Sequence, residues 1–84
     1  MAEVEVKLYG ELHLDSKIKS TTVNAENVSG IFDELNRQIL HIDGAKPVHY
    51  KDALVYINGK RCSFKRKKLK EKDVIWLMSP TIGG

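Results

Sequence analysis

The stretch NVSGIFDELNRQIL (residues 27–40) decides the fold, because here the apolar residues take up the spacing of a helix. They stand at i, i+3, i+4, i+7 and i+11, which places them on one stripe of an α-helix. The five residues are Val28, Ile31, Phe32, Leu35 and Ile39. Asn27 is a suitable N-cap, since its side-chain oxygen can accept a hydrogen bond from an unpaired amide of the first turn. The stretch therefore predicts one amphipathic helix that ends before Asp43 and Gly44.

Two other features of this helix predict its contacts. Gly30 costs about 1 kcal/mol relative to alanine in a helix interior, so its presence indicates that another part of the backbone packs closely there. Asp33 and Arg37 are four residues apart and are expected to form an ion pair on the exposed face, worth roughly a few tenths of a kcal/mol.

The segments before the helix are expected to supply two strands. In EVEVKLYG (residues 3–10), apolar and charged residues alternate, which is the period of a strand with one buried face. Residues 10–17 contain turn formers and no run of apolar residues, so they are expected to form a loop. The β-branched segment IKSTTV (residues 18–23) is then expected to be a second strand.

The segments after the helix supply a hairpin. ALVYI (residues 53–57) is expected to be a strand, and the Asn58-Gly59 dipeptide is a strong signal for a tight hairpin because both turn positions need positive φ. KRCSF (residues 60–64) would return as a short strand. Leu69 is expected to insert an apolar side chain beneath the polar turn that follows.

The last strand, VIWLM (residues 74–78), completes the order of elements. Its continuous apolarity means that both faces are covered or that one is offered to a partner. The order strand, strand, helix, strand, short strand, strand fits a mixed sheet of four to five strands with one main helix across it. The two terminal strands would lie adjacent and parallel. This α+β arrangement is the β-grasp.

The composition sets limits on function. A chain of 84 residues buries only about 60 to 65% of its unfolded surface, which leaves little room for an enclosed active site. Cys62 is the single cysteine, so no internal disulfide can form, which suits the reducing cytoplasm. No apolar run approaches the ~20 residues that span a bilayer, and the first residues lack the pattern of a secretion signal. We therefore expect a cytoplasmic protein without a membrane segment.

Several motifs, in order along the chain, resemble the ubiquitin-like sulfur carriers of the MoaD/ThiS type. VYINGK (residues 55–60) is similar to the family's V-x-V-N-G hairpin, and NVSGIFDEL (residues 27–35) to its helix start. The family closes its last strand with a pattern like D-x-V-x-x-[LF]-P-P-x-x-G-G, with Ser79 here in place of the first proline. The matching residues are Asp73, Ile75, Met78, Pro80, Gly83 and Gly84. In length the chain is most like the small subunit of molybdopterin synthase.

The resemblance implies that the functional group is the carboxylate of Gly84. An ATP-dependent adenylyltransferase of the ubiquitin-activating type would form an acyl-adenylate at Gly84, and sulfide would displace AMP to leave a thiocarboxylate. The molybdopterin synthase large subunit, or another sulfur acceptor, would then receive the sulfur for molybdenum cofactor biosynthesis. The resemblance implies no enzyme activity and no cofactor for the chain itself, because the activating partner uses the ATP.

The residue chemistry of the last four positions agrees with that role. Glycine has no Cβ, so the terminal pair could thread a slot too narrow for any side chain. Pro80 cannot donate to a strand ladder and is expected to end the sheet, which would let the tail project by as much as ~14 Å. The expected division is a β-grasp domain, residues 1–80, and a flexible tail that enters a partner's active site. The tail residues are Thr81, Ile82, Gly83 and Gly84. The alternative is an ordinary frayed terminus.

Two surfaces are candidate docking sites. Alternation in the last strand places Trp76 and Met78 on one face of the sheet, and either face could contact a partner or belong to the core. From Lys60 to Lys72 the chain has eight basic residues against one acid. This run could be a solvated turn, a surface for an acidic protein or a nucleic-acid site, and the lack of a stacking motif argues against nucleic acid. The expected docking residues are Trp76, Met78, Lys60, Arg61 and Arg66.

Other chemistry is not expected from the sequence. His13, His41 and His49 lack the spacing of metal ligands, and no phosphate-binding or nucleophile motif is present. The alternatives to a molybdopterin-pathway carrier are a thiamine-pathway sulfur carrier, a ubiquitin-like modifier joined to target lysines through Gly84, and a plain interaction module.

Overall fold

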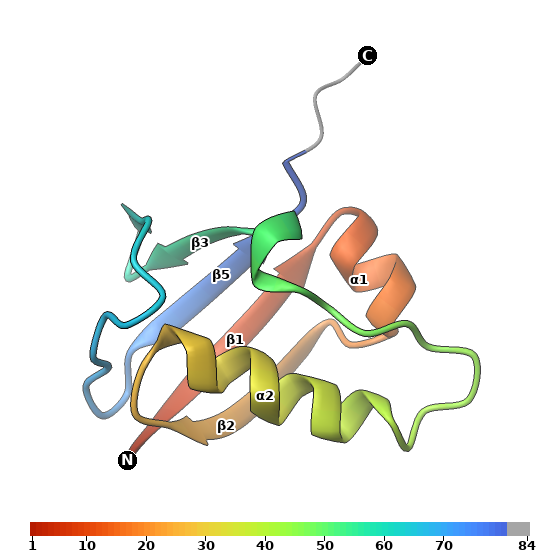
Figure 1. Ribbon diagram of the computed structural model, residues 1–84, viewed down its shortest axis with the longest axis horizontal. Helices are drawn as coiled ribbons and strands as arrows, with labels where there is room; N and C mark the ends of the chain where they lie inside the picture. Colours follow the sequence, from red (N-terminus) through yellow and green to blue (C-terminus); the bar gives the residue numbers. More distant parts are fainter. Residues whose placement is uncertain (81–84) are drawn as a thin grey trace.

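Five strands form one mixed sheet in the order β2-β1-β5-β3-β4, and a long helix crosses one of its faces (Figure 1). This computed structural model describes residues 1–80. The strands are β1 (Ala2–Tyr9), β2 (Ser20–Ala25), β3 (Leu54–Ile57), β4 (Lys60–Cys62) and β5 (Val74–Met78). The helices are α1 (Glu11–Ser16), α2 (Val28–Ile39) and a single 3-10 turn, η1 (Tyr50–Asp52). The predicted α+β class, with one main helix across a mixed sheet, is confirmed.

The first and last strands lie side by side in the middle of the sheet. β1 and β5 are parallel, with Val6 opposite Ile75 and Leu8 opposite Leu77. β1 also pairs antiparallel with β2, and β5 pairs antiparallel with β3. Within residues 1–80, β5 is therefore the strand that joins the β1-β2 hairpin to the β3-β4 hairpin.

Helix α2 packs as its sequence pattern predicts. The apolar stripe from Val28 to Ile39 is buried against the sheet. The Asn27 side chain caps the helix by accepting a hydrogen bond from the Gly30 amide at 3.0 Å. A Cβ on Gly30 would lie 3.3 Å from the Ala25 Cβ, so the glycine allows the close approach of β2 that we expected.

Two predictions about local structure are wrong. Residues 10–17 contain the six-residue helix α1 instead of a loop. Leu12 and Ser16, four residues apart, are its buried residues, and a helix this short shows too little apolar periodicity to be recognised in the sequence. Arg37 pairs with Glu34, three residues before it, at 3.8 Å, instead of with Asp33. Both acids are within helical reach of Arg37, so spacing alone did not distinguish them.

The β3-β4 hairpin and the turn after it agree with the sequence. Asn58 and Gly59 have φ values of 51° and 86°, the left-handed conformation that a two-residue hairpin requires. Leu69 is buried, and its amide donates to the Glu26 carbonyl at 3.0 Å, which holds the 63–73 segment against the start of α2. None of the helices in residues 1–80 has the length and apolarity needed to cross a bilayer.

Candidate functional site

The candidate site begins where β5 leaves the sheet. The strand ends at Met78, which is paired with Tyr9 of β1 on one side and with Leu54 of β3 on the other. Ser79 and Pro80 follow outside the strand. The prediction that the sheet ends at Pro80 is therefore confirmed to within a residue. The exit point lies at the middle of the sheet, between two neighbouring strands, so its position is fixed by the core of the fold.

A contact between Ser79 and Gly10 holds the exit in place. The Glu11 amide donates a hydrogen bond to Ser79 Oγ at 3.3 Å, which links the start of α1 to the residue after β5. Gly10 has φ 64° and ψ −140°, a conformation that favours glycine strongly. A Cβ on Gly10 would lie 2.6 Å from Ser79 Oγ. The corner between β1 and α1 thus depends on glycine for two separate reasons, and Ser79 is directly involved in one of them.

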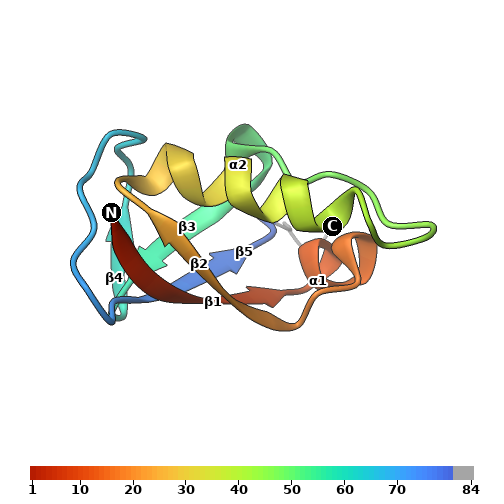
Figure 2. The same ribbon diagram turned by 90° about the horizontal axis from the view of Figure 1, so that it is seen from below.

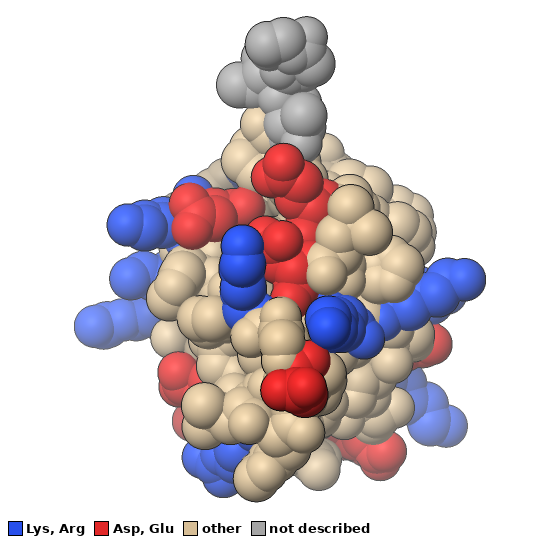
Figure 3. Space-filling model, turned by 90° about the vertical axis from the view of Figure 1, so that its right-hand side faces the viewer, with Lys and Arg blue, Asp and Glu red and all other residues tan. Residues whose placement is uncertain are grey.

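Acidic residues lie on one side of this exit point. A shallow pocket of about 300 Å³ lies beside Ser79 and Pro80, between α1 and η1. Its wall carries three carboxylates, from Glu11, Asp15 and Asp52. Figure 3 shows acidic side chains gathered over this end of the molecule. The root of the tail therefore offers negative charge to any partner that receives it.

The face of the sheet opposite α2 is the second part of the candidate site. Ile75 and Leu77 are fully buried beneath α2, whereas Trp76 and Met78 are only half-buried on the opposite face. Figure 2 shows α2 on one side of the sheet and no helix of residues 1–80 on the other. The structure thus decides between the two sets that the sequence left open: Trp76 and Met78 are on the uncovered face.

Trp76 lies in a row of large side chains across this face. In the strand register, Lys7 of β1, Trp76 of β5, Tyr56 of β3 and Arg61 of β4 are successive partners. The Trp76 and Tyr56 rings have centroids 6.2 Å apart and are tilted by 44°. Aromatic rings with a flanking arginine are typical of protein interfaces, so the row has the character of a docking surface.

Comparison with known proteins supports the assignment of the fold. No protein family and no curated protein matches this sequence. The small archaeal modifier protein 1 from Methanosarcina acetivorans is similar in structure, with a TM-score of 0.76 and 21% identity, over 100% of this chain and 98% of that one. A chain in the complex of subunits 1 and 2 of the molybdopterin-converting factor from Helicobacter pylori matches with a TM-score of 0.66 and 22% identity, over 98% of this chain and 99% of that one.

A third match is Urm1 from Trypanosoma brucei, with a TM-score of 0.64 and 17% identity, over 98% of this chain and 95% of that one. All three comparisons cover nearly the whole chain. The fold is the ubiquitin-like β-grasp. The fold that the motif resemblance implied is thus confirmed.

The β-grasp brings together some of the predicted docking residues and separates others. Trp76, Met78 and Arg61 share the uncovered face of the sheet. Lys60 is opposite Ile57, so alternation places it on the other side of β4. Arg66 lies in the turn near the start of α2, away from this face. Sequence analysis missed Tyr56 and Lys7, which the alternation within β3 and β1 could have placed once the strand order was known.

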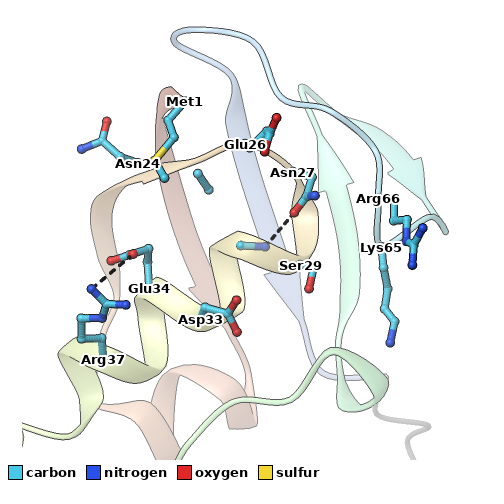
Figure 4. Close-up of a pocket in the computed structure, with 12 residues that line it drawn as sticks. Met1, Asn24, Glu26, Asn27, Ser29, Asp33, Glu34, Arg37, Lys65 and Arg66 are labelled. Carbon is cyan, nitrogen blue, oxygen red and sulfur yellow. Dashed lines mark hydrogen bonds and ion pairs between the residues drawn. The ribbon is translucent and has the colours of Figure 1, made fainter.

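Arg66 belongs to a different hollow of the β-grasp, shown in Figure 4. Asp33, Glu34 and Arg37 line it from α2, and Lys65 and Arg66 line it from the turn. Its volume is about 720 Å³ and its charges are of both signs. This hollow does not include the exit of β5, so we do not assign it to the tail's chemistry.

The tail itself, Thr81, Ile82, Gly83 and Gly84, lies outside the described residues. Within residues 1–80, no group of three or more His, Cys, Asp or Glu side chains is placed to hold a metal ion. Cys62 is buried, and its thiol donates to the Phe64 carbonyl at 3.6 Å. The described part of the chain thus supplies a rigid exit for the tail, with an aromatic face beside it.

Proposed function

We propose that this protein is a sulfur carrier whose C-terminal glycine, Gly84, is adenylated and then converted to a thiocarboxylate. The observation that carries the proposal is the central β5 strand, which runs straight into Ser79 and Pro80 and from there into a sequence ending in Gly83-Gly84. We assign it specifically to the small subunit of molybdopterin synthase, because a chain of the H. pylori molybdopterin-converting factor complex shares its fold over nearly its full length.

The proposed chemistry takes place on the terminal carboxylate. An oxygen of the Gly84 carboxylate attacks the α-phosphorus of ATP and releases pyrophosphate, which leaves an acyl-adenylate. Hydrosulfide then attacks the acyl carbon, and the acyl–phosphate C–O bond breaks to release AMP. Loss of the proton from sulfur gives the thiocarboxylate. A terminal carboxylate is ionised at neutral pH, so the first step needs no base from this chain.

Glycine at the last two positions suits this use because the partner must reach the acyl carbon from several directions. Without Cβ atoms, the backbone can enter a narrow channel in the adenylyltransferase and later in the large subunit. The uncovered sheet face, with Trp76 at its centre, would dock on the partner while the tail occupies that channel. We propose Trp76, Met78 and Arg61 as docking residues on this face, whereas Lys60 and Arg66 lie off it.

Intact-mass spectrometry tests the proposal directly. The full chain, a cognate adenylyltransferase of the ubiquitin-activating type, ATP and sulfide should give the mass increase of one oxygen-to-sulfur exchange. The variant lacking Gly84 should give none, although it should unfold at the same urea concentration. If the full chain remains unmodified by an enzyme that modifies its own known carrier under the same conditions, the carrier function is refuted.

The docking face is tested by the rate of the same reaction. Trp76→Ala should raise the KM for the carrier by about tenfold and leave the product mass unchanged, since interface aromatic residues contribute roughly 1 to 2 kcal/mol or more. Leu14→Ala is the matched control, because Leu14 is an exposed apolar residue of α1 and is not part of the sheet. An equal effect of the two substitutions would show that the sheet face is not the docking surface.

A second candidate function is that of a protein modifier, because similar structures are those of small archaeal modifier proteins. Gly84 would then form an isopeptide bond with target lysines. The last basic residue is Lys72, so trypsin would leave residues 73–84 attached to each target lysine. Detection of this remnant in cell extracts would support the modifier. A stable complex with a molybdopterin synthase large subunit, without such conjugates, would support the carrier.

A further inference from the structure

Within residues 1–80, no carboxylate pairs with the positive charges of the basic segment between β4 and β5, and Lys65 Nζ lies 5.6 Å from the centroid of the Tyr50 ring. Among residues 1–80, the one ion pair joins Arg37 to Glu34, and it lies outside this segment. The nearby acids are engaged by amides: Asp73 accepts from Asn58 Nδ2 at 2.9 Å and from the Lys70 backbone amide at 2.8 Å. Glu71 accepts from the Glu3 amide at 3.0 Å. The ammonium groups of this segment therefore repel one another in the free protein.

The backbone of the segment is nevertheless held firmly. The Val28 amide donates to the Lys67 carbonyl at 3.1 Å, and the Ser29 amide donates to the Lys65 carbonyl at 2.8 Å. The turn thus caps the first turn of α2 with its carbonyl groups. The N-terminal end of a helix carries partial positive charge, so the lysines are placed where a cation lowers stability and an anion is favoured. A fixed scaffold with unpaired charge is a suitable binding surface.

These side chains surround a groove with an exposed aromatic ring. The groove measures about 510 Å³ and lies between the β3-β4 hairpin and the turn. Lys60, Arg61, Lys67, Lys68 and Lys70 line it. Phe64, which also lines the groove, is 72% exposed. An apolar ring left in water among cations indicates a ligand that is both acidic and partly apolar.

The groove runs beside a free sheet edge. β4 is an edge strand of the sheet. It pairs with β3 on one side, and its other side pairs with no strand of residues 1–80. An exposed edge can add a strand from another protein through main-chain hydrogen bonds. Nucleic acid does not extend a sheet through main-chain hydrogen bonds to a strand edge. Surfaces that bind single-stranded nucleic acid stack successive bases on several aromatic rings, whereas Phe64 is the one aromatic residue among those that line this groove.

We infer that this groove binds an acidic, extended segment of a partner protein, which adds to the free edge of β4 and rests an apolar side chain on Phe64. The groove does not include the exit of β5, and it meets the Trp76 row at Arg61, which belongs to both surfaces. The inference does not depend on the sulfur-carrier function, because it uses neither Gly84 nor an activating enzyme.

Fluorescence anisotropy tests the site with a peptide probe. The probe is a fluorescein-labelled peptide in which glutamate alternates with valine, with ~12 residues so that at about 3.3 Å per residue it extends beyond both ends of β4. We expect binding at low salt that weakens as the salt concentration rises. The matching glutamine-valine peptide should bind at least about tenfold more weakly.

Two triple variants separate the groove from general positive charge. Replacing Lys67, Lys68 and Lys70 by glutamine should weaken binding of the acidic peptide by about tenfold or more. Replacing the exposed residues Lys19, Lys46 and Lys51 by glutamine removes the same charge away from the groove and should change binding less than about twofold. Phe64→Ala should weaken binding without changing its salt dependence. Circular dichroism checks that each variant is folded.

A second readout locates the peptide on the β4 edge. Amide chemical shifts in NMR spectra should change at Lys60–Cys62 and around Phe64, and not along β2, the opposite edge of the sheet. Three outcomes overturn the inference: no binding of the acidic peptide, equal weakening by the two triple variants, or tighter binding of an oligothymidine of equal length. The last outcome would assign the surface to nucleic acid.

Discussion

Replacing Gly10 by alanine should destabilise the protein by about 2 to 6 kcal/mol, and Ser79 should account for part of that loss. The backbone of Gly10, with φ 64° and ψ −140°, is costly for any residue with a Cβ, by about 1 to 3 kcal/mol. The new Cβ would also lie 2.6 Å from Ser79 Oγ, a clash that must be relieved by movement. Overpacking of this kind typically costs about 1 to 3 kcal/mol more.

Urea denaturation, followed by the fluorescence of Trp76, the single tryptophan, measures this change. Gly59→Ala is the first control, because Gly59 also has a positive φ, 86°, but has no atom within 4 Å of the added Cβ. The loss of stability in Gly59→Ala should therefore report the cost of a positive φ without a steric clash. Any entropic gain from replacing glycine in the unfolded chain is shared by both variants and cancels in the comparison.

The second control is the double variant Gly10→Ala with Ser79→Ala. Without Oγ, the nearest neighbour of the new Cβ is the Cβ of residue 79 at 3.9 Å, which is an ordinary contact. A double-mutant cycle should therefore give a coupling energy of about 1 kcal/mol or more. If Gly10→Ala costs no more than Gly59→Ala, or if Ser79→Ala does not reduce its cost, the contact does not hold the exit as we argue.

Three further predictions concern stability and access. Asn27→Ala should lower the free energy of unfolding by about 1 kcal/mol because it removes the cap of α2, whereas Asn24→Ala, at an exposed position of β2, should change it by less than about 0.5 kcal/mol. Equal effects of the two substitutions in urea titrations would contradict the capping role of Asn27. Leu77→Ala should cost about 2 to 5 kcal/mol, because Leu77 is fully buried beneath α2, while Leu14→Ala, at 71% exposure, should be nearly neutral in the same titration. The buried thiol of Cys62 should react slowly with a thiol reagent in the native protein and rapidly in urea, and a fast native reaction would contradict its burial.

The sequence predicted the elements whose apolar period is long enough to be unambiguous. The stripe from Val28 to Ile39 covers three turns, so α2 and its cap at Asn27 could be located correctly. The six residues of α1 cover less than two turns, and the hydrogen bond that anchors its first residue comes from Ser79, 68 residues away in the chain. Local pattern carries no information about such contacts.

The candidate site, like the fold, was predicted only in part from the sequence. Gly84 and the other tail residues were named from their position in the chain and stay predictions, because they lie outside the described residues. Which face of β5 is uncovered could not be decided from VIWLM, since every residue of it is apolar. The parallel register resolves it: Ile75 lies opposite Val6, so it must share the helix-covered face that the alternation in β1 defines.

The central position of β5 has a consequence for when the protein matures. The β1-β2 hairpin and the β3-β4 hairpin are each formed by neighbouring segments, but in residues 1–80 they meet only through β5, which is the last strand to be synthesised. A nascent chain can therefore form the two halves but cannot join them until residues 74–78 have left the ribosome. Under the proposed function, an activating enzyme that recognises the assembled sheet would therefore act only on copies in which β5 has joined the two hairpins.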